Sequence, residues 1–375
     1  MILRKIAYIC DKISRILLKA VESNFLKFVQ GPKQFKIPIY QRPYSWSIKQ
    51  CEQLWNDILG SAIDKTIQGH FIGSIVYIQG EIYQSGAISE LVVIDGQQRL
   101  TTLILLLKAI SNHIRELNIE GPNSSKRINN YYLINNDEDN PDLRPKLILT
   151  KGDRETLGDL IQDRAIESNE YNKILQNYQF FREQIAQSKI DINEILNGIN
   201  KLFIVDISLE RDKDNPQLIF ESLNSTGLEL SQADLIRNFI LMRLDSKEQE
   251  RIYDEYWFPM EKEFEVEDYD IYFNRFMRDY LTIQLERIPN MSDVYSEFKT
   301  YISSRNNNFL EIIKKIRQYS KLFSNLVYAK DEDDDIKQVI KDINELRVEV
   351  SYPFSCKFIL TIKMEQYQKT NSFKS

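Results

Sequence analysis

The chain has 375 residues, of which 42% are hydrophobic and 28% charged, and this is the composition of an ordinary globular protein with room for two domains. Its three cysteines are widely spaced and include no CxxC pair, which excludes a disulfide framework and fits a reducing cytoplasm. With only two histidines, a histidine-based metal or nuclease centre within the chain is not expected. No run of about 18 apolar residues occurs, so no membrane span is predicted.

Charge is distributed unevenly along the chain. The net charge is −6, yet the first fifty residues hold ten Lys/Arg against two Asp/Glu, so the remainder carries −14. A basic N-terminal face would suit nucleic acid or nucleotide phosphates. The alternative is a solvated helix face that docks on the acidic part of the same chain, and the sequence leaves both open.

The hydrophobic pattern predicts alternating helices and strands in the first part of the chain. Pro38 marks the extended segment QFKIPIY as an edge strand or a strand start, because proline donates no hydrogen bond to a sheet. In chain order we expect a helix near 8–29, the extended segment, a helix at 47–66, strands at 70–78 and 91–94, and a long helix at 97–117.

Residues 118–146 are rich in Asn, Asp, Pro and Ser and predict a long excursion with a short hairpin between YYLIN and PKLIL. The elements expected after it are helices over 153–198, a strand at 201–209, and two helices over 220–244 joined by a turn at 224–227, the second capped by Ser231.

From residue 245 onward the pattern is helical, acidic and rich in aromatics, without a further strand signal. The predicted fold class is therefore α+β, followed by an all-helical domain. We place the first domain at residues 1–240 and the helical domain at residues 241–375.

The most informative stretch is VVIDGQQRLTTLILLL at residues 92–107, where a strand-like run ends in a polar turn that opens into an apolar helix. The first N–H groups of a helix have no partner within it and lie at the positive end of the helix dipole, so anions bind there. This stretch predicts a phosphate site. The alternative is an ordinary DG turn followed by a surface arginine.

Each residue of the turn suits such a site chemically. Gly96 would let the backbone approach a phosphate, and Arg99 can direct two N–H donors onto phosphate oxygens. Gln97 and Gln98 can donate hydrogen bonds without adding charge, and Asp95 could hold a metal ion or position a water.

Three other segments carry candidate groups. IPIYQRPYSW, at residues 37–46, contains Gln41, Arg42, Tyr44 and Trp46, which could stack a nucleobase and reach phosphate, or form a structural aromatic plug.

FESLNSTGLELS contains Asn224 in a polar turn, although Asn and Gly are common in turns of any function. In HFIGSIV, Gly73 within a strand indicates a close approach of a ligand or of another backbone. His70 could act as a base, but a histidine at a strand start is more often structural.

In this order, IPIYQRPYSW, FIGSIV, VVIDGQQRLTT and FESLNSTGLELSQADLIRN resemble the N-terminal domain of GmrSD-type modification-dependent restriction proteins, over about residues 20–245. That domain is similar to the ParB/sulfiredoxin-like fold. The resemblance implies a domain that binds and hydrolyses nucleoside triphosphates (NTPs) in bacterial defence against foreign or modified DNA.

The resemblance also implies the roles of individual residues. The catalytic residues would be Asp95, Gln98 and Arg99, and Asp95 would be the metal ligand, with Mg²⁺ as cofactor. The nucleotide-binding residues would be Gln41, Arg42, Gly96, Gln97 and Asn224, to which we add Tyr44, because the base could stack on Tyr44 or Trp46.

The chain departs from full-length relatives, which commonly continue into an HNH-type nuclease domain, because it has no histidine after His113. DNA cleavage by this chain alone is therefore not expected, and a separate HNH-type nuclease subunit is an expected partner besides NTP and DNA. Two alternatives stay open: a non-catalytic nucleotide- or DNA-binding regulatory module, and a decayed remnant of a restriction gene.

Overall fold

The computed structural model describes residues 19–79, 88–136, 140–166, 172–210, 216–224, 230–264, 269–305, 308–331 and 333–372. The chain divides into two compact units, residues 1–226 and 227–375. This division assigns the helix after Ser231 to the second unit, whereas the sequence-based boundary followed it at residue 240.

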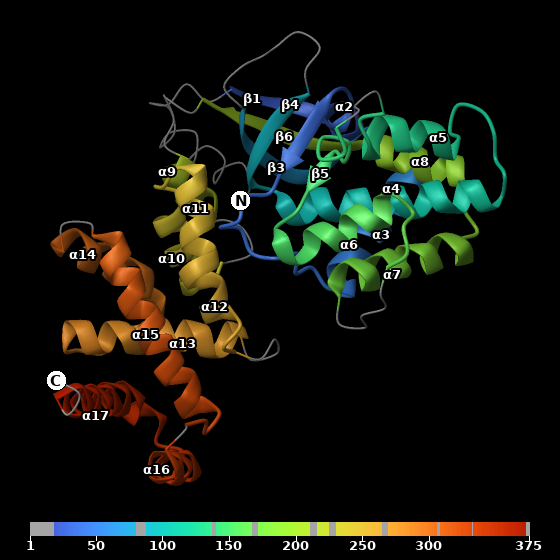
Figure 1. The fold of residues 1–375 in the computed structure, drawn as a ribbon. Helices are drawn as coiled ribbons and strands as arrows, with labels where there is room; N and C mark the ends of the chain where they lie inside the picture. The colour runs from blue at the N-terminus through green and yellow to red at the C-terminus, as the bar shows by residue number, and fades with distance from the viewer. Residues whose placement is uncertain are drawn as a thin grey trace. The chain divides into compact units, whose positions relative to one another are not determined.

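The first unit contains a six-stranded mixed sheet within its described part, in the order β1-β6-β3-β4-β2-β5 (Figure 1). The strands β1/β6 and β3/β4 pair antiparallel, whereas β3/β6, β2/β4 and β2/β5 pair parallel. The bounds are β1 Lys19–Asn24, β2 Lys33–Lys36, β3 His70–Gln79, β4 Ser89–Asp95, β5 Leu147–Ile148 and β6 Leu202–Leu209.

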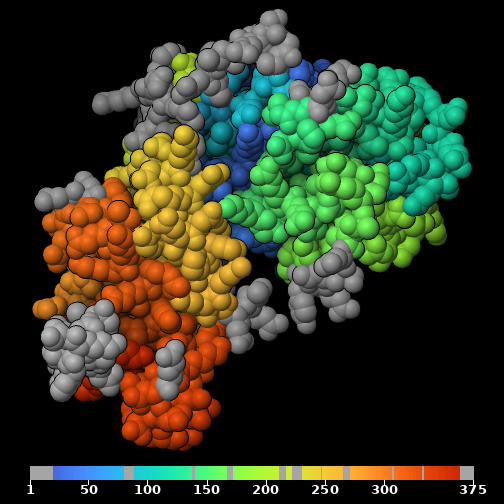
Figure 2. Space-filling view, in the orientation of Figure 1, coloured from blue at the N-terminus to red at the C-terminus, as the bar shows by residue number. Residues whose placement is uncertain are grey.

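The helices of this unit gather beside the sheet (Figure 1). They are α2 Phe25–Val29, α3 Ile48–Ile63, α4 Gln97–Glu116, α5 Ser125–Ile128, the π-helical turn Asn129–Leu133, α6 Lys151–Ile161, α7 Lys173–Gln187, α8 Ile192–Asn200 and α9 Pro216–Asn224. The helix α4 packs on α7, and α3 packs on α8. In Figure 2 the visible face of this unit is formed largely by the green segments that follow α4.

The helix α4 forms the centre of the hydrophobic core. Its leucines and isoleucines from Leu100 to Ile114 are almost completely buried on all sides, as expected for a helix that other elements surround. Burying each such side chain contributes roughly 1.5–3 kcal/mol. The core therefore holds the first turn of α4 in a fixed place relative to β4, which directly precedes it.

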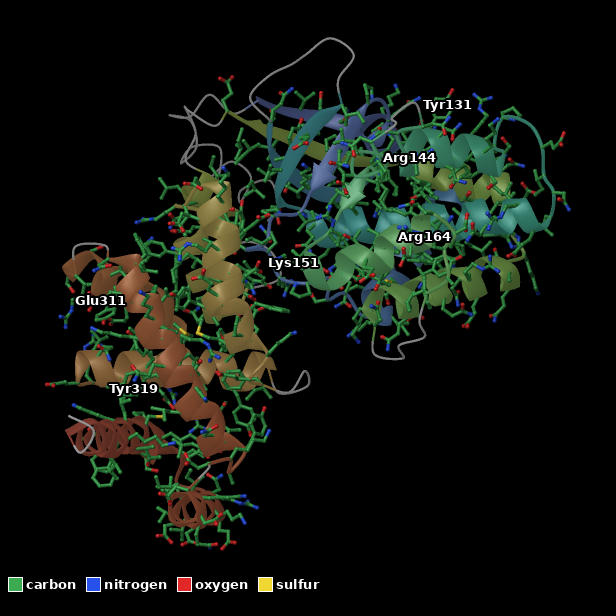
Figure 3. The ribbon with its side chains drawn as sticks, viewed as in Figure 1. Tyr131, Arg144, Lys151, Arg164, Glu311 and Tyr319 are labelled. Atoms are coloured by element: carbon green, nitrogen blue, oxygen red, sulfur yellow. The ribbon has the colours of Figure 1, made fainter. Side chains whose placement is uncertain are left out.

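The second unit is helical throughout its described residues (Figure 1). The helices are α10 Gln232–Leu241, α11 Ser246–Ile252, a π-helical turn Tyr253–Trp257, α12 Phe258–Glu261, α13 Tyr269–Leu285, α14 Val294–Ser304, α15 Phe309–Val327, α16 Asp334–Glu345 and α17 Tyr352–Ser372, with short 3₁₀ turns at Met291–Asp293 and Glu349–Ser351. Aromatic rings fill its core. Tyr319 of α15, labelled in Figure 3, meets Tyr280 of α13 edge-on at 5.8 Å between ring centroids.

The structure confirms most of the predicted elements. The strands expected at 70–78, 91–94 and 201–209 are β3, β4 and β6, and the helices expected at 47–66 and 97–117 are α3 and α4. Ser231 caps α10 as predicted, because its Oγ accepts a hydrogen bond from the Asp234 N–H at 3.0 Å. The α+β class and the helical second part are correct.

The helix predicted near 8–29 is wrong over part of its length. Residues 1–18 lie outside the described residues, 19–24 form β1, and only Phe25–Val29 are helical. Pairing with β6 along the whole of β1 overrides the helical pattern. Asn24 then ends the strand, since its side chain accepts a hydrogen bond from the Lys27 N–H and starts α2.

Two further expectations change. The edge-strand interpretation of QFKIPIY is wrong, because β2 lies between β4 and β5. The strand ends before Pro38, so the missing N–H group of the proline interrupts no strand pairing. The predicted hairpin between YYLIN and PKLIL is reduced to one antiparallel bridge, Ile134 to Pro145, because Asn129–Leu133 form a π-helical turn instead of a strand. None of the described helices combines the length and the apolar character needed to cross a bilayer.

Candidate functional site

The turn between β4 and α4 is built around Gly96. Its φ is +93°, a left-handed conformation that favours glycine, and it is the N-cap residue of α4 without a side-chain cap. A Cβ atom at this position would lie 2.9 Å from the Ser74 carbonyl oxygen of β3. Only glycine therefore fits, and the N-terminal end of α4 lies directly against β3.

Two glutamine side chains fasten the 37–46 loop, the segment between β2 and α3, to this turn. Gln97 donates from Nε2 to the Arg42 carbonyl oxygen at 2.9 Å, and Gln41 donates from Nε2 to the Ile94 carbonyl oxygen at 2.9 Å. Both side chains are buried. The backbone of Arg42 is thereby held beside the first residue of α4.

Gln98 holds the next part of the same loop. Its Oε1 accepts hydrogen bonds from the backbone N–H groups of Ser45 (2.9 Å) and Trp46 (3.2 Å), and its Nε2 donates to the Pro43 carbonyl oxygen at 3.3 Å. The loop has no regular secondary structure, so side chains satisfy the backbone groups that a sheet or helix would otherwise satisfy.

Tyr44 points into the protein interior and is 3% exposed. Its hydroxyl group lies 2.6 Å from Thr102 Oγ1 of α4 and accepts a hydrogen bond from Asn177 Nδ2 of α7 at 2.9 Å. Burial raises the pKa of this hydroxyl well above its usual value. Trp46 is only partly buried against the core, and its carbonyl oxygen accepts a hydrogen bond from the same Asn177.

Arg99 and Asp95 form an ion pair at the mouth of the turn. Arg99 Nη2 lies 3.3 Å from Asp95 Oδ2 and donates to the Ser74 carbonyl oxygen at 2.7 Å, and the two side chains are 28% and 30% exposed. Arg42 is also partly exposed, and its guanidinium group makes no hydrogen bond or ion pair within the described residues. The first turn of α4 thus carries one ion pair, and the loop held against it places the backbone of Arg42 beside it.

The remaining predicted residues lie elsewhere or outside the description. Asn224 is the last residue of α9, which contacts β4, but its side chain and residues 225–229 lie outside the described residues. His70 starts β3 and its Nε2 lies 3.4 Å from Asp57 Oδ2 of α3, which agrees with the structural interpretation. The neighbour of Gly73 is not the expected ligand or backbone but the Arg99 guanidinium, which a Cβ at position 73 would crowd.

A comparison with protein families identifies the family to which this chain belongs. The family described as GmrSD restriction endonuclease, N-terminal domain, matches residues 25–241, which is more than half of the chain. The chain belongs to this family. The GmrSD match contains β2, β3, β4 and the first turn of α4, together with the loop held against it. A search of curated proteins found no match.

Membership of the GmrSD N-terminal domain family makes the protein a component of a restriction system. It also supports the resemblance on which the site residues were selected. The individual roles of those residues in binding and catalysis are predictions.

Two supporting residues of this GmrSD domain escaped the sequence analysis. Asp153, near the start of α6, accepts a hydrogen bond at its Oδ2 from the Tyr44 N–H at 2.6 Å, and Asn177 binds both Tyr44 and Trp46. Burial raises the pKa of the Asp153 carboxyl, an effect that the Tyr44 N–H partly offsets. Both residues lie more than a hundred positions from the loop, so no local pattern indicated them.

The residues present fit a magnesium ion only if the phosphates of a bound nucleotide supply further ligands. No cluster of three or more His, Cys, Asp or Glu side chains suited to a metal occurs within the described residues. Asp95 is a single carboxylate, and Mg²⁺ in nucleotide sites is typically bound by one or two carboxylates together with substrate phosphates.

Proposed function

We propose that this GmrSD-family protein binds a nucleoside triphosphate at the first turn of α4 and hydrolyses it as its contribution to a restriction system. The observation that carries the proposal is the fixed position of that turn. A buried helix, a left-handed glycine and a loop tied down by three glutamines converge there, with Arg99 and Arg42 alongside.

The electrostatics of the turn favour triphosphate. The N-terminal end of a 20-residue helix contributes unpaired N–H groups and a positive dipole end, Arg42 adds a full charge, and Arg99 adds a charge that Asp95 partly offsets. Phosphoryl transfer depends mainly on positioning and on stabilising charge at the phosphates. Arg99 and Arg42 would neutralise the charge that develops on the leaving phosphate, and Gly96 would let the backbone approach it.

Asp95 would act beside Arg99. Its carboxylate lies next to the helix terminus and would orient the attacking water or contribute a ligand to Mg²⁺. The ion, when bound, would supply charge neutralisation at the phosphates. The present pairing of Asp95 with Arg99 prevents the carboxylate from repelling an incoming anion as an isolated charge would.

The nucleobase would stack on Trp46. Tyr44 belongs to the same loop, but its ring is buried and its hydroxyl is engaged by Thr102 and Asn177, which makes Trp46 the better placed aromatic surface. Base–aromatic stacking typically contributes about 1–3 kcal/mol per base. Gln97 and Gln41 would act on the nucleotide indirectly, through the loop that they hold.

DNA and a separate HNH-type nuclease are the proposed macromolecular partners, with nucleotide turnover coupled to the sensing of foreign or modified DNA. The second candidate function is a nucleotide- or DNA-binding regulatory module that does not hydrolyse. The observation that favours it is the internal use of Gln41, Gln97 and Gln98, whose amides hold the loop instead of facing a substrate.

The test measures phosphate release by the purified chain with ATP, GTP, CTP or UTP and Mg²⁺, with and without modified and unmodified DNA. We expect turnover in the unmodified protein and its loss in Arg99→Ala. Arg115→Ala is the matched control, because Arg115 lies in the last turn of the same helix and pairs with Asp163. Saturable nucleotide binding without turnover would support the regulatory module, and equal turnover in Arg99→Ala would remove this arginine from the mechanism.

A further inference from the structure

Gly73 has a backbone conformation that the strand around it does not require. Its φ is +110°, and the pairing of β3 with β6 shifts register between Phe71 and Ser74, on either side of it. Residues with a Cβ rarely adopt this conformation. A strand residue of this kind commonly marks a place where another group must come close to the backbone.

The group that comes close is the guanidinium of Arg99. A Cβ atom added to Gly73 would lie 3.0 Å from Cζ and 3.1 Å from both Nε and Nη1 of Arg99. Three atoms of one rigid planar group would therefore be crowded at once. The crowded group is the end of a flexible side chain, so an added methyl would displace the guanidinium more readily than the backbone of β3.

Within the described residues, the hydrogen bonds of the Arg99 side chain use one of its nitrogens, Nη2. Nη2 donates to the Ser74 carbonyl oxygen and pairs with Asp95, whereas Nε is buried without a hydrogen-bond partner. Nη1 forms no hydrogen bond within the described residues. The space left by the missing Cβ of Gly73, and not a second hydrogen bond within the described residues, is thus what accommodates the Nε and Nη1 edge.

Gly96 lies close to the Ser74 carbonyl oxygen, the same atom that accepts the hydrogen bond from Arg99. The Ser74 carbonyl oxygen that binds Arg99 is the atom that a Cβ on Gly96 would approach to 2.9 Å. Gly96 therefore brings the first turn of α4 against Ser74, and Gly73 opens the space into which the Arg99 side chain returns from that turn. Together they determine the direction of the guanidinium.

From these contacts we infer that Gly73 is a positioning residue: it seats the Arg99 guanidinium with Nη2 on the protein and Nη1 directed toward a phosphate. The expected effect on turnover rests on the proposed nucleotide site, whereas the position of the guanidinium does not. A side chain at position 73 shifts the guanidinium and leaves the charge of the site unchanged.

The experiment compares Gly73→Ala with Gly121→Ala. Gly121 has nearly the same φ, +113°, and nothing lies within 4 Å of an added Cβ, so this control carries the backbone strain without the contact. We expect Gly73→Ala to lower NTP turnover by about 100-fold, as a misplacement near 1 Å can, and Gly121→Ala to leave it unchanged.

A measurement on the nucleotide-free protein tests the position of the Arg99 guanidinium independently of the proposed function. The Nε–H resonance of Arg99, identified by its loss in Arg99→Ala, should shift in Gly73→Ala and stay in place in Gly121→Ala. If no NTP is turned over by the unmodified protein, the proposed hydrolysis fails and this resonance alone decides the seating. An unshifted resonance, or turnover equal to that of Gly121→Ala, would overturn the inference.

Discussion

Gln98 ties three loop residues, Pro43, Ser45 and Trp46, to the first turn of α4 through both ends of one amide. From the sequence, the same residue is a candidate catalytic group. The two roles make different demands, because an amide that holds a loop must keep its partners throughout, whereas a catalytic amide must meet the reacting atoms. A substitution can separate them.

We expect Gln98→Ala to release the loop. The Ser45 and Trp46 N–H groups lose their acceptor, so the free energy of unfolding should fall by about 1–3 kcal/mol, and the amide hydrogens of both residues should exchange faster. Hydrogen exchange with mass spectrometry and urea titration measure the two effects. Gln179→Ala is the control, since Gln179 bonds only an exposed helix neighbour, Glu183. Loss of turnover with unchanged exchange would instead establish a direct catalytic role.

At the scale of the element, the charged residues of a motif in α10 form buried ion pairs that hold two helices together. The segment SQADLIRN carries part of the family resemblance, and within it Arg237 is almost fully buried between Asp234 at 2.6 Å and Glu261 of α12 at 2.5 Å. Trp257 and Tyr253 also donate to Glu261. The charged residues of this motif therefore join α10 to α12 inside the second unit.

Removing the positive member of this triad should be costly. Arg237→Met leaves Asp234 and Glu261 as buried like charges, and we expect a loss of about 3–5 kcal/mol in the free energy of unfolding. Arg251→Met is the matched control, because Arg251 pairs with Glu248 and Glu255 on an exposed surface where solvent screens such pairs, so its loss should change stability little. Equal effects in urea denaturation of the two variants would contradict the structural role.

At the scale of the whole molecule, the pH dependence of stability should reflect a buried carboxyl in the second unit. Burial raises the pKa of Asp279 from 3.8 to about 6, although Arg275 and Arg278 lie close enough to oppose the shift. A carboxyl with a raised pKa stabilises the fold fully below its unfolded pKa, and this contribution is lost as the pH rises through the folded pKa.

The expected window is therefore pH 4 to 6. Across it the unmodified protein should lose about 3 kcal/mol relative to Asp279→Asn, whose side chain does not titrate. Urea titrations of both proteins at pH 4, 5, 6 and 7 measure the difference, and the full chain is used so that the first unit contributes equally to both. A constant difference between the two proteins across these pH values would show that Asp279 does not titrate there.

Local pattern was sufficient for the elements whose burial is periodic. The short apolar runs of β3, β4 and β6 and the long apolar run of α4 are recognisable in the sequence, because burial requires apolar side chains over the length of each element. Local pattern predicted the wrong structure in two places. At β1, pairing with β6 replaces the helix that the amphipathic pattern indicates, and at 129–133 a π-helical turn replaces a strand. In both places, neighbours distant in sequence decide the backbone conformation.

The sequence by itself determined the α+β class, the helical second part, the family and the position of the DGQQR turn, because ordered motifs and local propensities are properties of short segments. Only the tertiary structure decided what the side chains of that turn do. Asp153 and Asn177 reach the loop across more than a hundred residues, and the glutamines turn inward to it. Hydrogen-bond partners depend on distances in space, so the network that holds Arg42, Arg99 and Trp46 at one helix terminus exists only in the folded chain.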